Sequence, residues 1–532
     1  MRNVKLLCLC LALLTLLSAC NGNTENLSSD VPPHESDTVV EGKRNYLTLL
    51  YSAADSFNPY TLKTDANRQI VKLLYEPLVR VNDRFEPINA LADSVEVSGT
   101  KCVVSLKNAR FSDGTPVTDQ DVIYSYNLAK DSDTVYSDKL YEVESVTLES
   151  GKVVFNLTKN DPYFANVLDF PIIKTDSDTK TDSDSVSLPP IGCGRFKLNE
   201  SHDGLILNEN YFGKIKNIRE IRLINAPDSE SVAHYTEIGA ADMYFTEISD
   251  GNITRMSGKR QEINLNNLVF LGINQNYAPL NERSLRQALS AAVDRVKLCE
   301  KAYYNNAVSA TGFFHPMWRE TSSIQNIEIT ANKEITIENL EEIGYNKLNS
   351  EGIRINSNGT PLKFTLLVNS ENRIRVLAAN TVAAQLKSAG IGVTVIEKSY
   401  DQYITALTSG NFQLYLGEVK FTDNMDVSPL FMNGGQAAFG LPYSKTETVD
   451  EAQKEQDDEE AKPQATSSQK VMHEYHKGNV TVKDVASVLQ TEMSAVPLCY
   501  RTGVLFYNSN MKNVKNSSVG DIYFSIESYL IN

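Results

Sequence analysis

The chain has 532 residues, of which 41% are hydrophobic and 22% are charged, a balance typical of folded globular proteins. Its 51 basic and 67 acidic residues give a formal charge of −16. This excess of acid argues against nucleic acid or an anionic membrane surface as the main partner. The length allows more than one domain.

The N-terminus has the pattern of a secretory signal. Two basic residues precede an uncharged run from Leu6 to Leu17, shorter than the roughly 20 apolar residues that span a bilayer. Small residues before Cys20 and a polar stretch after it resemble the lipobox of bacterial lipoproteins, with an ordinary signal peptide as the alternative. We therefore expect a signal peptide over residues 1–19, lipidation of Cys20, and a flexible tether over residues 20–45.

Strand and helix patterns alternate from Tyr46 onward. Residues 46–51 are predicted to form a strand, followed by a polar and aromatic loop from Ser52 to Tyr60. The apolar spacing over residues 67–78 predicts a helix that ends at Pro77. Two β-rich runs, 143–148 and 152–157, predict a hairpin.

The stretch from Phe111 to Lys130 combines a turn with a capped helix. Residues 102–106 before it are short, apolar and β-branched, which predicts a strand. Gly and Pro residues then favour a tight turn. Thr118 can cap the following helix, and Asp121 lies favourably near its positive end.

The second half of the chain has the pattern of a parallel sheet covered by helices. Residues 269–274 predict a strand, and Asn281 is expected to cap one helix whose apolar face runs from Leu285 to Val296. Residues 362–416 then read strand, helix, strand, helix, strand. Ligands of such sheets lie outside the carboxyl ends of the strands. Residues 496–507 predict a strand that returns to the first half.

Four cysteines remain after the signal segment: Cys102, Cys193, Cys299 and Cys499. Their spacing contains no CxxC pair, and an even number leaves disulfides open without assigning them. Three of them, Cys102, Cys299 and Cys499, fall in apolar elements, which favours buried thiols.

Enzyme motifs are missing from the sequence. It has no Gly-x-Ser-x-Gly elbow, and His473 and His476 are one residue too close for the zinc-protease spacing. No catalytic constellation, metal site or cofactor is therefore predicted.

Residues 106–129, LKNARFSDGTPVTDQDVIYSYNLA, resemble the signature of the extracellular family 5 solute-binding proteins of ABC importers. The similarity extends over residues 74–79, 91–93, 285–290, 294–295 and 496–500, and covers the chain from about Tyr46 onward. The resemblance implies an α/β fold of the periplasmic-binding-protein type, in the class with an extra domain. Its two lobes hold mixed sheets with helices on their faces, and a cleft lies between the lobes.

The resemblance also implies domain boundaries. We expect lobe I to comprise residues 46–82, 190–265 and 496–532, with an additional domain at 83–189. Lobe II is expected over residues 266–495, with an acidic surface loop at 445–470. Segments 266–271 and 496–505 are expected to cross between the lobes and to act as the hinge.

The function that the resemblance implies is substrate binding for an ABC importer. The expected protein is a monomeric lipoprotein, anchored outside the cytoplasm, that captures oligopeptides or dipeptides and delivers them to a permease with cytoplasmic ATPases. The alternatives are a non-peptide ligand such as a nickel chelate and, less favoured, a cell-surface enzyme such as a peptidase.

Loops after the strands supply the candidate ligand contacts. The expected contacts are Ser52, Asn58, Asn274, Asn276, Asp423 and Asp426. Asp423 is favoured as the partner of a peptide α-ammonium group, and Asp426 is its rival. The register is open because Glu418 stands where the family usually has a Trp. Both aspartates could equally be ordinary capping residues of the loop.

Overall fold

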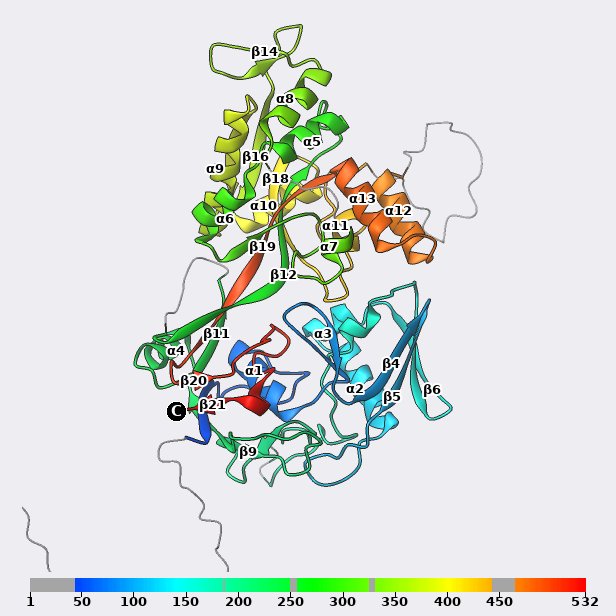
Figure 1. The fold of residues 1–532 in the computed structure, drawn as a ribbon, viewed down its shortest axis with the longest axis vertical. Coiled ribbons are helices and arrows are strands. Elements are labelled where there is room, and N and C mark those ends of the chain that lie inside the picture. Colours follow the sequence, from blue (N-terminus) through cyan, green and yellow to red (C-terminus); the bar gives the residue numbers. More distant parts are fainter. Residues whose placement is uncertain (1–43, 184, 186, 249–255, 325–330, 443–464) are drawn as a thin grey trace, which may run out of the picture. The chain divides into compact units, whose positions relative to one another are not determined.

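The computed structural model describes residues 44–183, 185, 187–248, 256–324, 331–442 and 465–532. These residues belong to one compact unit that begins at Arg44 (Figure 1). The predicted signal segment, Cys20 and the tether lie outside them, as do residues 443–464 of the predicted acidic loop. No helix of the described residues is long and apolar enough to cross a membrane.

The first sheet has the order β1-β10-β9-β8, and β1 pairs with β10 in parallel. β1 spans the six residues predicted for it. Helix α1 follows, with the Thr64 hydroxyl accepting a hydrogen bond from Asn67 N. It starts earlier than predicted, because this cap lies upstream of the expected start. It also ends earlier, at Leu74, because Tyr75 is already extended. The strands of this sheet are β1 (Tyr46–Tyr51), β8 (Phe196–Leu198), β9 (Gly204–Leu207) and β10 (Glu220–Asn225). Around it lie α1 (Asp65–Leu74), α4 (Ser229–Glu237), η2 (Ile526–Ser528) and two small two-stranded sheets, β2 (Val79–Val81) with β3 (Pro87–Asn89) and β20 (Met511–Lys512) with β21 (Leu530–Ile531).

A second sheet, β4-β5-β7-β6, is antiparallel throughout. The predicted hairpin is its β6–β7 pair. Helix α2 has the predicted cap: Thr118 and Asp121 form a capping box. Its elements are β4 (Ala92–Ser98), β5 (Lys101–Leu106), α2 (Asp119–Asp131), α3 (Val135–Lys139), β6 (Val143–Glu149), β7 (Lys152–Leu157) and η1 (Phe164–Val167). One continuous core joins this sheet to the first sheet. We call the parts built around this core lobe I.

The third sheet is built mainly from the second half of the chain, in the order β11-β19-β12-β18-β16-β17, with β13 beside β19. The predicted strand-helix alternation is present as β16, α9, β17, α10 and β18. β16 is parallel to both β17 and β18. The elements are β11 (Met243–Glu247), β12 (Lys259–Ile273), β13 (Ala307–Ser309), β16 (Lys363–Asn369), α9 (Arg373–Ser388), β17 (Gly392–Lys398), α10 (Tyr400–Thr408), β18 (Leu414–Lys420) and β19 (Ala495–Tyr507).

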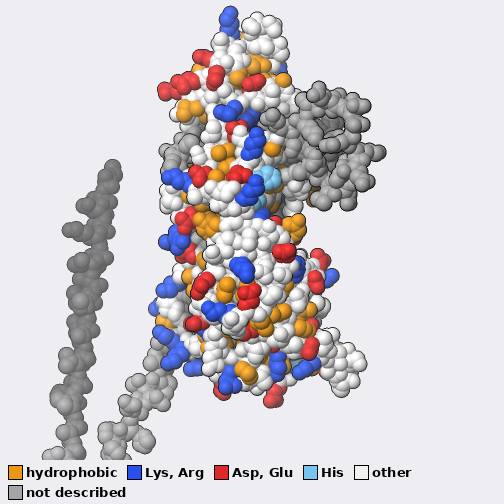
Figure 2. All heavy atoms as spheres, turned by 90° about the vertical axis from the view of Figure 1, so that its right-hand side faces the viewer, with side chains coloured by type: hydrophobic (Ala, Val, Ile, Leu, Met, Phe, Trp, Pro, Cys, Tyr) orange, Lys and Arg blue, Asp and Glu red, His pale blue; other side chains and the backbone are white. Residues whose placement is uncertain are grey.

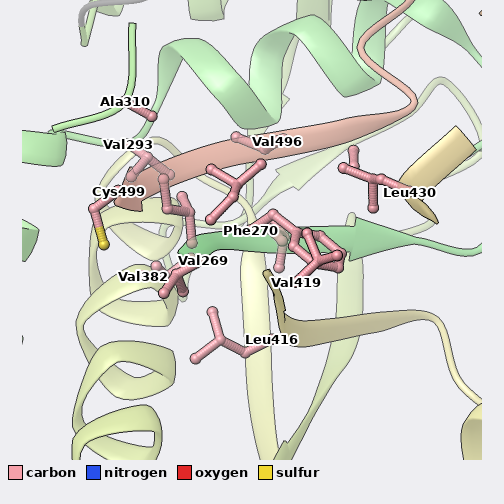
Figure 3. Close-up of a cluster of buried hydrophobic side chains, with 14 of the residues drawn as sticks. Val269, Phe270, Val293, Ala310, Val382, Leu416, Val419, Leu430, Val496 and Cys499 are labelled. Carbon is pink, nitrogen blue, oxygen red and sulfur yellow. The ribbon is translucent and has the colours of Figure 1, made fainter. Parts of the chain in front are cut away.

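Helices and a second large core complete this part of the molecule, which we call lobe II. Val269 and Phe270 of β12, Leu416 and Val419 of β18, and Val496 of β19 meet in its interior (Figure 3). The remaining elements are α5 (Arg283–Ala291), α6 (Arg295–Tyr303), α7 (Thr321–Ile324), α8 (Lys333–Glu342), β14 (Lys347–Leu348), β15 (Arg354–Ile355), α11 (Ser428–Phe431), α12 (Ser467–His476) and α13 (Val482–Glu492).

Two long strands connect the lobes. β12 and β19 run side by side from one lobe to the other (Figure 1) and pair in antiparallel fashion from Lys259↔Tyr507 to Gly272↔Ala495. Their register shifts between Asn264 and Leu268. This irregularity lies beside the predicted crossing segment at 266–271, so the strand pair is interrupted where the two cores part.

Two local predictions need correction. The single helix expected over 285–296 is two helices, α5 and α6, because the Asp294 side chain accepts a hydrogen bond from Lys297 N and starts a second helix. The acidic loop expected up to Lys470 ends earlier, because Thr466 and Gln469 form the capping box of α12. The four cysteines are free thiols and all are buried, as predicted for Cys102, Cys299 and Cys499.

Candidate functional site

A cavity of about 770 Å³ lies between the lobes, within the size range of sites for small ligands. Lobe I contributes the end of β1, helices α1 and α3, and the loop after β10. The strand β11, which pairs with β19, also lines the cavity. Lobe II contributes the segment after β18, and β12 contributes the residues at its register shift. The residues used below are Ser52, Gln69, Lys72, Tyr136, Lys139, Asp169, Asn266, Asn267, Lys420 and Asp423.

Strand direction explains the lobe I wall. Because β1 and β10 are parallel, their carboxyl ends meet at one edge of the sheet. Ser52 follows β1, and residues 226–229 follow β10; both segments line the cavity. Ser52 is buried, and its backbone N–H and C=O are bound by the side chain of Asn67 in α1. The loop is therefore fixed against the helix that forms the next part of the wall.

Asp423 lines the cavity from lobe II and is paired across it. Lys139 Nζ of α3 donates to Asp423 Oδ2 at 2.8 Å and to Asp169 Oδ2 at 2.6 Å. All three side chains are at least 87% buried. Burial would lower the pKa of Lys139, but the two carboxylates outweigh it and raise the pKa above its usual value. The three groups carry a net charge of −1.

Several buried oxygens in the cavity wall have no hydrogen-bond partner. They are Gln69 Oε1 and Asp169 Oδ1 of lobe I, and Asn266 Oδ1 and Asn267 Oδ1 at the crossing strand. The amide nitrogens of the two asparagines are used: Asn266 donates to Thr422 O, and Asn267 donates to Glu418 Oε1. Buried acceptors normally have partners. The cavity wall therefore offers acceptors to a ligand that carries N–H donors.

The other predicted contacts do not line this cavity. Asn58 holds its own turn, accepting from Tyr60 N. Asn274 is buried and donates to Gly410 O and Phe412 O, and Asn276 is exposed and donates to Asn274 Oδ1. Both follow β12, which is antiparallel to β18. The carboxyl end of β12 thus lies at the opposite edge of the sheet from the cavity-lining Lys420.

Asp426, the rival of Asp423, binds a different lysine. Its Oδ2 accepts from Lys159 Nζ at 2.9 Å, and its Oδ1 accepts from Ser428 N. Lys159 also binds Glu142 at 3.0 Å. Burial would raise the pKa of Asp426, but Lys159 and these hydrogen bonds lower it. Asp426 is not among the cavity-lining residues.

Glu418, which the resemblance places where the family usually has a Trp, lies in a buried ion network. Its carboxylate accepts from Arg501 Nε at 2.8 Å and from Arg375 Nη2 at 2.9 Å. Burial alone would raise the pKa of Glu418, but Arg501 and Arg375 outweigh it and lower the pKa. Because Arg501 belongs to β19, the network holds β18 and α9 to a crossing strand.

Other side chains hold the lobes together beside the cavity. Asn166 Nδ2 of lobe I donates to the backbone oxygens of Phe85 and Asp423. Asp161 accepts from Asn424 Nδ2 at 2.6 Å. Tyr163 packs edge-to-face against Trp318 of lobe II, with ring centroids 4.8 Å apart. The lobes are therefore in direct contact along one side of the cavity.

Sequence reasoning missed several cavity residues. Asp65, Gln69 and Lys72 recur at helical spacing on α1, a signal that the sequence contains. Lys139 and Asp169 lie far apart in the chain and far from Asp423, so no local pattern relates them. Asn266 and Asn267 line the cavity only because β12 passes it before entering lobe II.

Comparison with known proteins agrees with this architecture. The chain is 24% identical over 408 residues to the oligopeptide-binding protein AppA of Bacillus subtilis, covering 72% of this chain and 74% of AppA. It is 23% identical over 428 residues to the periplasmic murein peptide-binding protein MppA of Escherichia coli, covering 73% and 76%. The solved structure of a nickel ABC transporter protein from Bacillus halodurans has a TM-score of 0.69 at 18% identity, covering 90% of this chain and 98% of that one.

Two lobes joined by crossing strands, with a cavity between them, define a ligand receptor of the periplasmic-binding-protein type. The model of bacterial extracellular solute-binding proteins, family 5, matches residues 86–440, which is more than half of the chain. The protein belongs to that family, as its sequence predicts. Its fold class is likewise confirmed.

Proposed function

We propose that the protein is the substrate-binding component of an ABC importer, that it captures oligopeptides or dipeptides in the cavity, and that it delivers them to a membrane permease. The observation that carries this proposal is the set of oxygens in the cavity wall, on lobe I and on the crossing strand β12, that have no hydrogen-bond partner among the described residues. A peptide main chain supplies N–H donors at regular intervals whatever its side chains are. Relatives described as peptide-binding support the same ligand class.

Binding is proposed to close the lobes about the crossing strands. The register shift in β12 gives the pair a place to bend, and contacts such as Asn424–Asp161 form only when the lobes meet. A ligand that contacts both walls binds the closed form better, which supplies the free energy of closure. Small-angle scattering should then give a smaller radius of gyration with peptide than without it.

The proposal extends to the N-terminus, where Cys20 would carry a lipid anchor that holds the protein outside the cytoplasm. Intact-mass analysis of membrane-extracted protein tests this. Cys20→Ala should abolish the lipid mass and release the protein; an unmodified, membrane-bound Cys20 would contradict the anchor.

Asp423 is proposed to bind the ligand's α-ammonium group. That group would compete with the ammonium of Lys139 for the Asp423 carboxylate. Asp423→Asn should weaken binding of free-amino peptides by roughly 1.5–3 kcal/mol, the contribution of a hydrogen bond to a charged group. N-acetylated peptides lack that charge and should lose much less in a calorimetric titration.

Asp426→Asn is the matched control, because Asp426 lies three residues away and outside the cavity wall. Equal losses for free-amino and acetylated peptides would remove Asp423 from the site. Native mass spectrometry of protein purified without refolding tests the ligand class itself. A copurified metal chelate in place of a peptide would favour the alternative ligand.

A further inference from the structure

Within the part of the chain that the structure describes, two lysines of the cavity wall form no ion pair: Lys420, which is exposed, and Lys72, which is partly buried. Helix α1 presents Asp65, Arg68, Gln69 and Lys72 to the cavity. Lys72 Nζ donates to Tyr136 Oη of α3 at 3.0 Å and lies 5.5 Å from the centre of that ring. Among the described residues, no carboxylate lies within ion-pair distance of Lys72. An ammonium group has three donors, and Tyr136 takes one of them.

The neighbouring cations differ from Lys72. Lys139 and Lys159 each bind two carboxylates. A small second cavity of about 20 Å³ borders Lys72 and Asp169, and its two arginines, Arg80 and Arg195, are also paired with acids. Asp169 acts on Lys72 electrostatically, but its Oδ2 is bound to Lys139.

Burial would lower the pKa of Lys72, but Tyr136 and Asp169 raise it, so the group is an ammonium. Only Tyr136 binds it directly, and its two remaining N–H donors have no partner among the described residues. The cavity is the side from which an acceptor for them can come. Tyr136 strengthens the argument, since its hydroxyl accepts from Lys72 and retains its own proton for donation. The Lys72 ammonium and the Tyr136 hydroxyl thus offer two neighbouring hydrogen-bond donors on one wall of the cavity. Such a pair fits the two oxygens of a carboxylate.

We propose that Lys72, with the hydroxyl of Tyr136, binds a carboxylate of the ligand, and that the site therefore selects ligands carrying one. The inference rests on the proposed function and deepens it, because it specifies the peptides that are preferred. The carboxylate belongs either to the C-terminus of the peptide or to an acidic side chain. Both sources present the same group to Lys72.

Calorimetric titration with three peptides tests the proposal: trialanine, trialaninamide, and the amide of Ala-Glu-Ala. Wild-type protein should bind at least one of the two carboxylate-bearing peptides roughly tenfold more tightly than trialaninamide, the factor expected of a charge-assisted hydrogen bond. The peptide that shows the preference identifies the source. Lys72→Met should abolish the preference, because it should weaken binding of the preferred carboxylate-bearing peptide more than binding of trialaninamide.

Two further variants keep the test decisive. Lys72→Arg retains the charge and should retain the preference, which a purely structural role for Lys72 would not require. Lys63→Met is the matched control, because Lys63 is exposed just before α1 and outside the cavity wall, so its loss changes net charge alone. Thermal unfolding should show that each variant is folded.

Each contrary result has a separate meaning. Wild-type protein that binds all three peptides equally, or Lys72→Met protein that keeps the preference, would overturn the role of Lys72 alone. A Lys72→Met change that weakens the binding of all three peptides by the same factor would also overturn it. Wild-type protein that binds none of the peptides would overturn the peptide assignment and this inference together.

Discussion

Two lysines of lobe I reach the same loop of lobe II, and their surroundings differ. Lys139 binds Asp423, and Lys159 binds Asp426, three residues farther on; each lysine also binds an acid of its own lobe. Only the Lys139 pair lines the cavity. We therefore expect the Lys139–Asp423 pair to be exchanged for ligand contacts, and the Lys159–Asp426 pair to hold the lobes wherever they meet.

The largest effect should come from Lys139→Met. The change leaves the buried Asp169 and Asp423 without an ammonium group, and breaking a buried pair in this way costs roughly 3–5 kcal/mol. We expect a lower free energy of unfolding in urea and a larger radius of gyration without ligand. Adding Asp423→Asn should recover part of the loss. Unchanged scattering and unchanged stability would show that the pair does not hold the lobes in solution.

A smaller effect is expected from Lys159→Met. Its partners Glu142 and Asp426 are more exposed than those of Lys139, so water compensates part of the loss. The free energy of unfolding should fall by roughly 1–2 kcal/mol, within the range between exposed and buried pairs. The preference for free-amino over acetylated peptides should not change. A loss of that preference, seen by calorimetry, would erase the distinction between the two lysines.

A third effect concerns pH at the same interface. Burial raises the pKa of Asp161 to about 6, against hydrogen bonds from Asn424 and Tyr163 that lower it. The folded state then binds more protons than the unfolded state between pH 3.8 and about 6, so stability should fall as pH rises through that window. The slope for this single group should be about 1.4 kcal/mol per pH unit at most.

The effect of Asp426 on stability has the opposite dependence on pH, because its pKa is lowered. Its stabilising contribution is fully present above pH 3.8 and is lost as pH falls below that value. Urea titrations at several pH values should show the Asp161 slope in wild-type protein and a flatter curve in Asp161→Asn. A slope that survives the substitution would assign it to other groups.

Features that are determined by neighbouring residues can be predicted from the sequence, whereas contacts between residues far apart in the chain cannot. The β1 strand, the Thr118 cap and the hairpin follow from neighbouring residues and were predicted correctly. Asn274 does not line the cavity, and the sequence does not indicate this, because strand direction within the sheet is set by pairing with β18, about 140 residues away. Lys139 and Asp169 meet Asp423 only through tertiary packing.

On the face shown in Figure 2, Lys and Arg side chains are interspersed with Asp and Glu. The excess of acid in the composition is therefore mixed with basic groups on that face. Ligand selection is expected to depend on the cavity.

The chain has a single tryptophan, Trp318, and it lies where the lobes meet. Its ring is 96% buried against Phe314 of its own lobe and Tyr163 of the other. Separating the lobes would remove Tyr163 and let water reach the indole, which shifts its emission to longer wavelength. The protein thus contains its own fluorescent reporter of closure, readable in native buffer without any attached dye and fast enough for stopped-flow mixing with peptide.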